Sequence, residues 1–180
     1  MGLKLAYEKN YHCLLLVVVG FSCNKEDKLT KAEAKVGFNG EQWEAKACWA
    51  YKSDRDVSKL TIRMGFEAYQ GYVNGLTLYN LTPTVGRQIL KPTNYDSLGL
   101  IYATYTSSQE EDVTGDEYKV VESDSLNNWV NITSAKDDFT KDIYGEFSVT
   151  MVRKKSFPNS PFPDTVRFRN GTFYISKVRD

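Results

Sequence analysis

Apolar and polar residues alternate along most of the chain after residue 35. This period of two is typical of β-strands, whose successive side chains point to opposite faces of a sheet. The segment 57–66 shows it most clearly, because every second position from Leu60 to Phe66 is large and apolar. The segment 42–51 alternates in the same way. It predicts one shared face for five residues: Trp43, Ala45, Ala47, Trp49 and Tyr51.

Turn residues divide the rest of the chain into further short strands. These strands are predicted at 73–81, 85–90, 98–105, 118–121, 129–133, 143–152, 165–168 and 172–178. Asn39 with Gly40 predicts a tight hairpin, and Asn170 with Gly171 predicts another between the last two strands. The polar segment 109–117 is expected to be a loop. No segment keeps a period of 3.6, so we expect no long helix.

Many short strands separated by turns predict an all-β fold. We expect a single, mostly antiparallel domain over residues 36–180, folded as a β-sandwich or a partly closed β-barrel.

An uncharged apolar run at 14–19 follows a weakly basic segment that contains Lys4 and Lys9. The run is shorter than the ~20 apolar residues that a membrane-spanning helix needs. A short apolar run with a basic flank and small residues after it is typical of a secretory signal peptide. We therefore interpret residues 1–22 as a signal peptide.

The residues Gly20, Phe21, Ser22 and Cys23 resemble a bacterial lipobox, although an aliphatic residue is more common than glycine at the first position. The resemblance implies cleavage before Cys23 and attachment of diacylglyceryl and acyl (palmitate-type) chains to it. Such chains anchor a protein because each buried CH₂ contributes about 0.8 kcal/mol. Residues 23–35 are then the lipidated cysteine and a flexible tether.

Lys25, Glu26 and Asp27 follow the cysteine directly. They resemble the Lys-acidic-acidic export signal of Bacteroidetes surface lipoproteins. This resemblance implies an outer-membrane location, on the cell surface. Without such export the domain would face the periplasm.

Charge and rare residues exclude several classes of function. The chain has 23 basic and 23 acidic residues, so it lacks the basic excess that nucleic-acid binding requires. Its one histidine, His12, lies in the predicted signal peptide, which argues against His-assisted hydrolases and His-based zinc sites. Cys48 is the thiol that remains beyond Cys23, and we expect it to be a small buried residue. We predict no metal, no cofactor and no enzymatic activity.

Aromatic residues are the remaining candidates for a binding surface. We expect four of them in the core: Trp43, Trp49, Trp129 and Tyr102. Tyr72, Phe157 and Phe162 lie in or beside polar loops, so they are the predicted surface contacts. The acidic groups at 110–112 and 137–142 are interpreted as solvated loops.

Four short motifs resemble a family of small all-β Bacteroidetes lipoproteins of unknown function. They are Phe38-Asn39-Gly40 with Trp43 and Ala45, then Asn131-Ile132-Thr133, Gly145-Glu146-Phe147, and Asn170-Gly171-Thr172-Phe173. The resemblance covers most of residues 36–178. It implies the fold but no functional residue, because the motifs consist of turn and core positions.

These observations predict a lipid-anchored cell-envelope protein that binds a glycan or an envelope protein without catalysis. Two alternatives stay open. One is a lipocalin-like carrier with an apolar cavity. The other is a carboxylate-dependent, glycan-active enzyme, which needs two facing acids in a cleft.

Overall fold

The computed structural model describes residues 33–53, 56–69, 72–92, 99–110, 113–156 and 158–179. This part of the chain contains ten β-strands and one short 3₁₀ helix, which confirms the predicted all-β fold. The elements are β1 (Glu33–Phe38), β2 (Glu41–Lys52), β3 (Leu60–Tyr69), β4 (Tyr72–Leu81), β5 (Gly86–Ile89), β6 (Tyr102–Glu110), β7 (Val113–Val120), η1 (Glu122–Asn127), β8 (Trp129–Lys136), β9 (Lys141–Lys155) and β10 (Thr165–Arg179). Within these residues no helix has the length and apolar character to cross a membrane.

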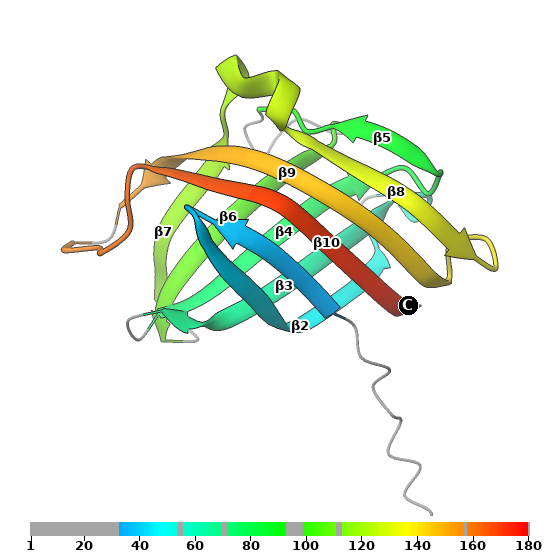
Figure 1. Ribbon diagram of the computed structural model, residues 1–180, viewed down its shortest axis with the longest axis horizontal. Helices are drawn as coiled ribbons and strands as arrows, with labels where there is room; N and C mark the ends of the chain where they lie inside the picture. The colour runs from blue at the N-terminus through cyan, green and yellow to red at the C-terminus, as the bar shows by residue number, and fades with distance from the viewer. Residues whose placement is uncertain are drawn as a thin grey trace, which may run out of the picture.

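All ten strands belong to one sheet that curls back on itself (Figure 1). The pairings run β1–β2–β3–β4–β6–β7–β9–β10, and β10 pairs again with β1, so these strands form a ring. Every neighbouring pair in this ring is antiparallel, while a short contact between β10 and β2 is parallel. The arrangement is therefore that of a partly closed barrel.

Two strands branch away from this ring. The first half of β9 pairs with β8, and β8 pairs with β5. The second half of β9 pairs with β7.

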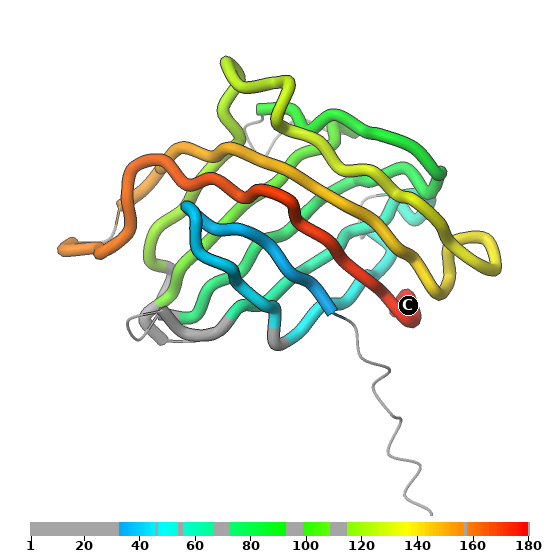
Figure 2. Tube along the Cα trace, viewed as in Figure 1, coloured from blue at the N-terminus to red at the C-terminus, as the bar shows by residue number. Residues whose placement is uncertain are grey.

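Figure 2 shows the same arrangement as a trace, with the β1–β2 hairpin lying beside β10. The strand β1 begins at Glu33, so residues 33–35, predicted as part of the tether, belong to the sheet.

A β-bulge reverses the alternation of β2 and makes one prediction wrong. The pairing of β2 with β3 skips Lys46. Before this bulge Trp43 and Ala45 pack against the core, whereas after it Cys48 and Ala50 are the buried residues. An inserted residue moves every later side chain to the opposite face. The five alternating residues predicted to share one face, which run from Trp43 to Tyr51, therefore lie on two faces.

Three of the four aromatics predicted for the core are half-buried on the outer face instead. Trp49 lies between Arg63 and Arg179, each with its guanidinium carbon 5.6 Å from the ring centre. Trp129 is covered by Arg87 in the same way, and Tyr102 stacks on Tyr79. Cation–π and stacking contacts of this kind cover large rings outside a core.

Two segments predicted as turns or loops carry strand residues. The segment 109–117 carries the end of β6 and the start of β7. Asn170 and Gly171 lie inside the continuous strand β10, where Asn170 has a φ of 52° at an irregularity in the pairing with β9. By contrast, the hairpin at Asn39 and Gly40 is confirmed, with φ angles of 48° and 96°.

The interior of the ring is filled by aromatic side chains. Phe168 lies 5.1 Å from Phe38 and 5.2 Å from Tyr105, measured between ring centres. Tyr105 in turn lies 5.2 Å from Tyr118, and Phe66 packs on the same cluster. All five residues are buried. Side chains of this size stabilise the barrel through a large apolar area removed from water.

Candidate binding site

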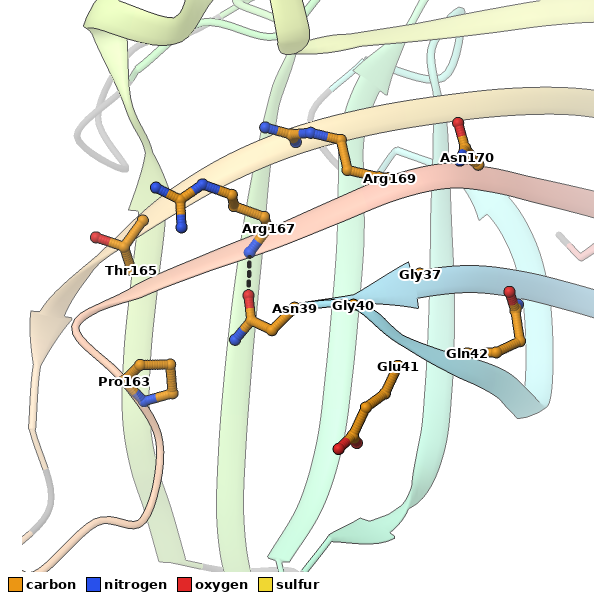
Figure 3. A pocket seen from close by; sticks show the side chains of 10 residues that line it. All are labelled: Gly37, Asn39, Gly40, Glu41, Gln42, Pro163, Thr165, Arg167, Arg169 and Asn170. Carbon is orange, nitrogen blue, oxygen red and sulfur yellow. Dashed lines mark hydrogen bonds between the residues drawn. The ribbon is translucent and has the colours of Figure 1, made fainter.

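The outer surface has a hollow where the β1–β2 hairpin lies against the first half of β10 (Figure 3). Its volume is about 630 Å³. Five lining residues come from the hairpin segment 37–42, and five come from the segment 163–170. The hollow thus joins parts of the chain that are more than 120 residues apart. Seven of its ten lining residues carry polar side chains, although carbon atoms make up the larger share of the exposed lining.

Hydrogen bonds in both directions hold the hairpin turn against β10. The side-chain Oδ1 of Asn39 accepts a hydrogen bond of 2.9 Å from the backbone nitrogen of Arg167 (Figure 3). The backbone nitrogen of Asn39 donates to the carbonyl of Arg167 at 3.0 Å. Asn39 and Gly40 both adopt positive φ, as a two-residue hairpin turn requires. One wall of the hollow is therefore fixed in place.

Two backbones approach each other closely at Gly37 and Arg169, which both line the hollow. A Cβ added at Gly37 would lie 3.2 Å from the carbonyl oxygen of Arg169. The pairing of β1 with β10 is irregular between Lys35 and Gly37. Glycine at this position lets the hairpin lie close to the bulged part of β10.

The guanidinium of Arg169 is held by many acceptors. Its Nη1 donates to three oxygens on β9 and β10: Ser148 Oγ at 3.3 Å, Val149 O at 3.1 Å and Phe168 O at 3.0 Å. Its Nη2 donates to Thr150 Oγ1 at 2.6 Å and to Asp124 Oδ2 at 3.2 Å. This side chain connects β10, β9 and η1, so its charge stabilises the domain.

Asp124 is the partner that neutralises Arg169. The hydroxyl of Thr150 and the amide of Asn127 both donate to this carboxylate. These hydrogen bonds, Thr150 first, and the nearby guanidinium lower the pKa of Asp124. It is therefore ionised at neutral pH. The ion pair with Arg169 holds η1 on the outer face of β9.

Arg167 differs from Arg169, although only one residue separates them. Its side chain is exposed and lines the hollow. Among the described residues, none accepts a hydrogen bond from its guanidinium or forms an ion pair with it. The hollow therefore contains a cationic group whose hydrogen-bonding capacity is available.

A second polar cluster lies beneath the segment 158–164. Asp116 has an exposed fraction of 0% and accepts a hydrogen bond from Ser160. Arg153 lies 4.0 Å from the same carboxylate and donates to the carbonyl of Phe162. The hydroxyl of Tyr118 donates to Pro163 O at 2.8 Å. These contacts fold the proline-rich segment back over the barrel, so this cluster is structural.

The prediction that Phe162 is a surface contact is wrong, because the segment 158–164 folds back over the barrel. Its side chain is only 4% exposed and packs edge-on against Tyr105, with 6.3 Å between ring centres. Phe157 lies outside the described residues, and so does the side chain of Tyr72, whose backbone belongs to β4. Cys48 is buried, as predicted, and burial raises the pKa of its thiol to about 12.

The predicted lipid and export residues Cys23, Lys25, Glu26 and Asp27 also lie outside the described residues. Of the predicted acidic loop, Asp137 pairs with Lys141 and Asp142 pairs with Lys136. No group of three or more potential metal ligands occurs within the part of the chain that the structure describes.

Sequence reasoning missed Arg167 and Asn39 as site residues. The alternation Arg167-Phe168-Arg169 was a usable signal, because it places two cations on one face of a strand around a core residue. Nothing in the local sequence shows that Asn39 lies against that face.

Fold and site define a small all-β domain with a hollow on its outer surface, lined mainly by residues with polar side chains. Comparison with protein-family models, with curated proteins and with solved structures found no match to this chain. The relationship to Bacteroidetes lipoproteins therefore stays a hypothesis based on the short motifs.

Proposed function

We propose that the chain is a lipid-anchored lipoprotein of the bacterial cell envelope and that its β-domain is a non-catalytic binding module. The hollow between the β1–β2 hairpin and β10 is its binding site. The observation that carries this proposal is the contrast within the hollow. Its walls are fixed by Asn39 and Arg169, while the guanidinium of Arg167 is unused. A rigid site with available polar groups favours binding, because little conformational entropy is lost.

The lining of the hollow supports binding over catalysis. Glu41 is the single carboxylate among its ten lining residues. Glycoside hydrolysis ordinarily uses two carboxyl groups about 5–9.5 Å apart. The partner of such a module is a glycan or another envelope protein.

The carrier alternative needs an internal void. The ring centres of Phe38, Phe168, Tyr105 and Tyr118 lie within 5.1–5.2 Å of the next ring in the cluster. This packing supports ranking a carrier of apolar ligands below an external binding site.

The anchor is tested with Cys23→Ala. We expect wild-type protein to incorporate labelled palmitate and to be cleaved on intact cells by added protease. The variant should lose both the label and the membrane association. Protection of a membrane-bound wild type would place the domain in the periplasm and reject surface export. An unchanged variant would reject the lipid anchor itself.

The binding site is tested with two threonine variants of the same strand. Thr165 lines the hollow, whereas Thr172 is exposed elsewhere on β10. Glycans and envelope proteins are screened against the wild type, Thr165→Trp and Thr172→Trp. We expect a ligand whose binding Thr165→Trp abolishes and Thr172→Trp leaves intact. A ligand that ignores Thr165→Trp would reject the hollow as its site, and an empty screen would reject the binding role.

A further inference from the structure

We infer that the hollow takes a saccharide that carries one anionic group, a carboxylate or a sulfate, and that Arg167 binds this group. The inference rests on the proposed function and adds the chemical class of the ligand. It follows from how charges and neutral polar groups are distributed around the hollow.

The first step is the contrast between two arginines on one strand. Arg169 gives its hydrogen bonds to β9, β10 and η1, and Asp124 neutralises its charge. The charge of Arg167 is not neutralised within the described residues. Its backbone is nevertheless fixed by two hydrogen bonds to Asn39. A guanidinium can bind carboxylate or sulfate oxygens with two parallel hydrogen bonds.

The second step is the neutral part of the lining. Asn39 uses its Oδ1 on the backbone of Arg167, so its amide nitrogen is left as a donor. Thr165, Gln42 and Asn170 add hydroxyl and amide groups, and none of the ten described lining residues is aromatic. Such groups match the hydroxyls of a sugar, whereas an apolar ligand would leave them without partners.

The third step is the position of Glu41. Figure 3 shows Arg167 pointing to one side of the hairpin and Glu41 to the other. Among the residues that the structure describes, no cation pairs with Glu41. The carboxylate of Glu41 would repel a second anionic group of the ligand, whereas a sugar hydroxyl could donate a hydrogen bond to it. The hollow therefore favours a ligand with a single negative charge over a polyanion.

The size of the hollow fits this class of ligand. Pockets that hold small molecules have volumes of about 300–1,000 Å³. The hollow, at about 630 Å³, lies within this range.

The test measures binding of four probes by calorimetry to the full chain in detergent. The probes are an oligosaccharide with a single uronic acid residue, the same oligosaccharide with that carboxyl group reduced to an alcohol, a form that carries several sulfates, and free acetate with sulfate. Arg167→Gln removes the proposed contact. Lys177→Gln, an exposed position on the same strand, is the matched control for lost charge. Glu41→Gln tests whether the carboxylate of Glu41 repels ligands with more than one negative charge.

We expect the oligosaccharide with one carboxylate to bind about tenfold or more tightly than its reduced form, the effect of a charge-assisted hydrogen bond. Arg167→Gln should abolish this preference and leave binding of the reduced form unchanged. Lys177→Gln should keep the preference. Glu41→Gln should tighten binding of oligosaccharides that carry several charges.

Three results would overturn the inference. Equal binding of the acidic and reduced oligosaccharides would reject the anionic group. Free acetate or sulfate binding as tightly as the oligosaccharide would reject the saccharide. If Arg167→Gln still prefers the acidic to the reduced oligosaccharide, Arg167 is not the group that binds the anion. In each case blockage by Thr165→Trp would still support the proposed function. If no probe binds and the screen with Thr165→Trp is also empty, both proposals fail.

Discussion

Gly171 of β10 lies directly beneath the ring of Phe147 on β9. A Cβ at Gly171 would lie 2.7 Å from Cδ1 of this ring and closer still to two other ring atoms. The relationship is reciprocal two residues further along, where a Cβ at Gly145 would lie 2.7 Å from Cε1 of Phe173. The two Gly-x-Phe motifs thus form paired contacts across the two longest strands. Aromatic rings that cover glycines on neighbouring strands stabilise a sheet pairing.

These contacts predict that Gly171→Ala destabilises the domain by about 1–3 kcal/mol, the cost of overpacking a filled core. Gly65→Ala is the matched control, because its Cβ would meet the nearest atom at 3.9 Å. Urea unfolding followed by tryptophan fluorescence measures both variants. Equal midpoints for Gly171→Ala and the wild type would contradict the proposed packing.

The ion pair between Arg169 and Asp124 predicts a pH-dependent stability. The pKa of Asp124 is lowered from 3.8 by its hydrogen bonds and by Arg169. The stability it contributes is fully present above pH 3.8 and is lost as the pH falls through the lower, folded value. Asp124→Asn should cost about 1–2 kcal/mol at pH 7. The difference from the wild type should shrink in acid.

Unfolding curves at pH 7 and at several values below 4 test this prediction. Glu122→Gln, on the exposed side of the same η1 turn, is the control and should follow the wild type. A difference between Asp124→Asn and the wild type that does not change with pH would assign the effect to shape and not to charge.

The hydroxyl of Tyr118 is predicted to hold the proline-rich segment on the barrel. It donates to Pro163 O, and burial is the main cause that raises its pKa to about 12. Tyr118→Phe should cost about 1 kcal/mol at neutral pH. A raised pKa means that the contribution is full below pH 10 and is lost as the pH rises towards 12. Tyr79→Phe, which keeps its stacked ring, is the control.

Hydrogen exchange of residues 158–164 gives an independent measurement of the same contact. Faster exchange of this segment is expected in Tyr118→Phe but not in Tyr79→Phe. Unchanged exchange would show that Arg153 and Ser160 hold the segment without this hydroxyl.

Cys48 is predicted to be inert in the folded chain. It is 5% exposed, and burial raises the pKa of its thiol to about 12, so little reactive thiolate exists at neutral pH. In a chain with Cys13→Ser and Cys23→Ser, maleimide labelling at pH 7.5 should be slow in buffer and fast in urea. Adding Cys48→Ala should remove the label. Rapid labelling of the folded chain would contradict burial of this thiol.

Much of the sheet could be predicted from the sequence. The alternation from Leu60 to Phe66 placed one strand and its buried face correctly. Asn39 and Gly40 placed the first hairpin. Both features depend on neighbouring residues alone, because side-chain direction and turn torsions are local properties.

Other features could not be predicted from local pattern. Asn170 and Gly171 have the composition of a hairpin turn, yet they form an irregularity within β10 because β9 offers a continuous partner of 15 residues. The bulge at Lys46 reverses the face of Trp49. Phe162 is buried because the segment that carries it folds over the barrel. Each outcome depends on a strand that is distant in sequence.

The sequence by itself determined the all-β class, the strand around residues 60–66 with its buried face, and the first hairpin. Tertiary structure alone decided which arginine is available. Arg169 meets Asp124, 45 residues earlier in the chain, while Arg167 meets the hairpin at Asn39, 128 residues earlier. Both arginines have the same chemistry and the same strand face. Closure of the ring brings the carboxylate of Asp124 to the guanidinium of Arg169. It brings Asn39 to the backbone of Arg167 and leaves the guanidinium of Arg167 without a partner among the described residues. The difference between the two arginines therefore arises from long-range contacts.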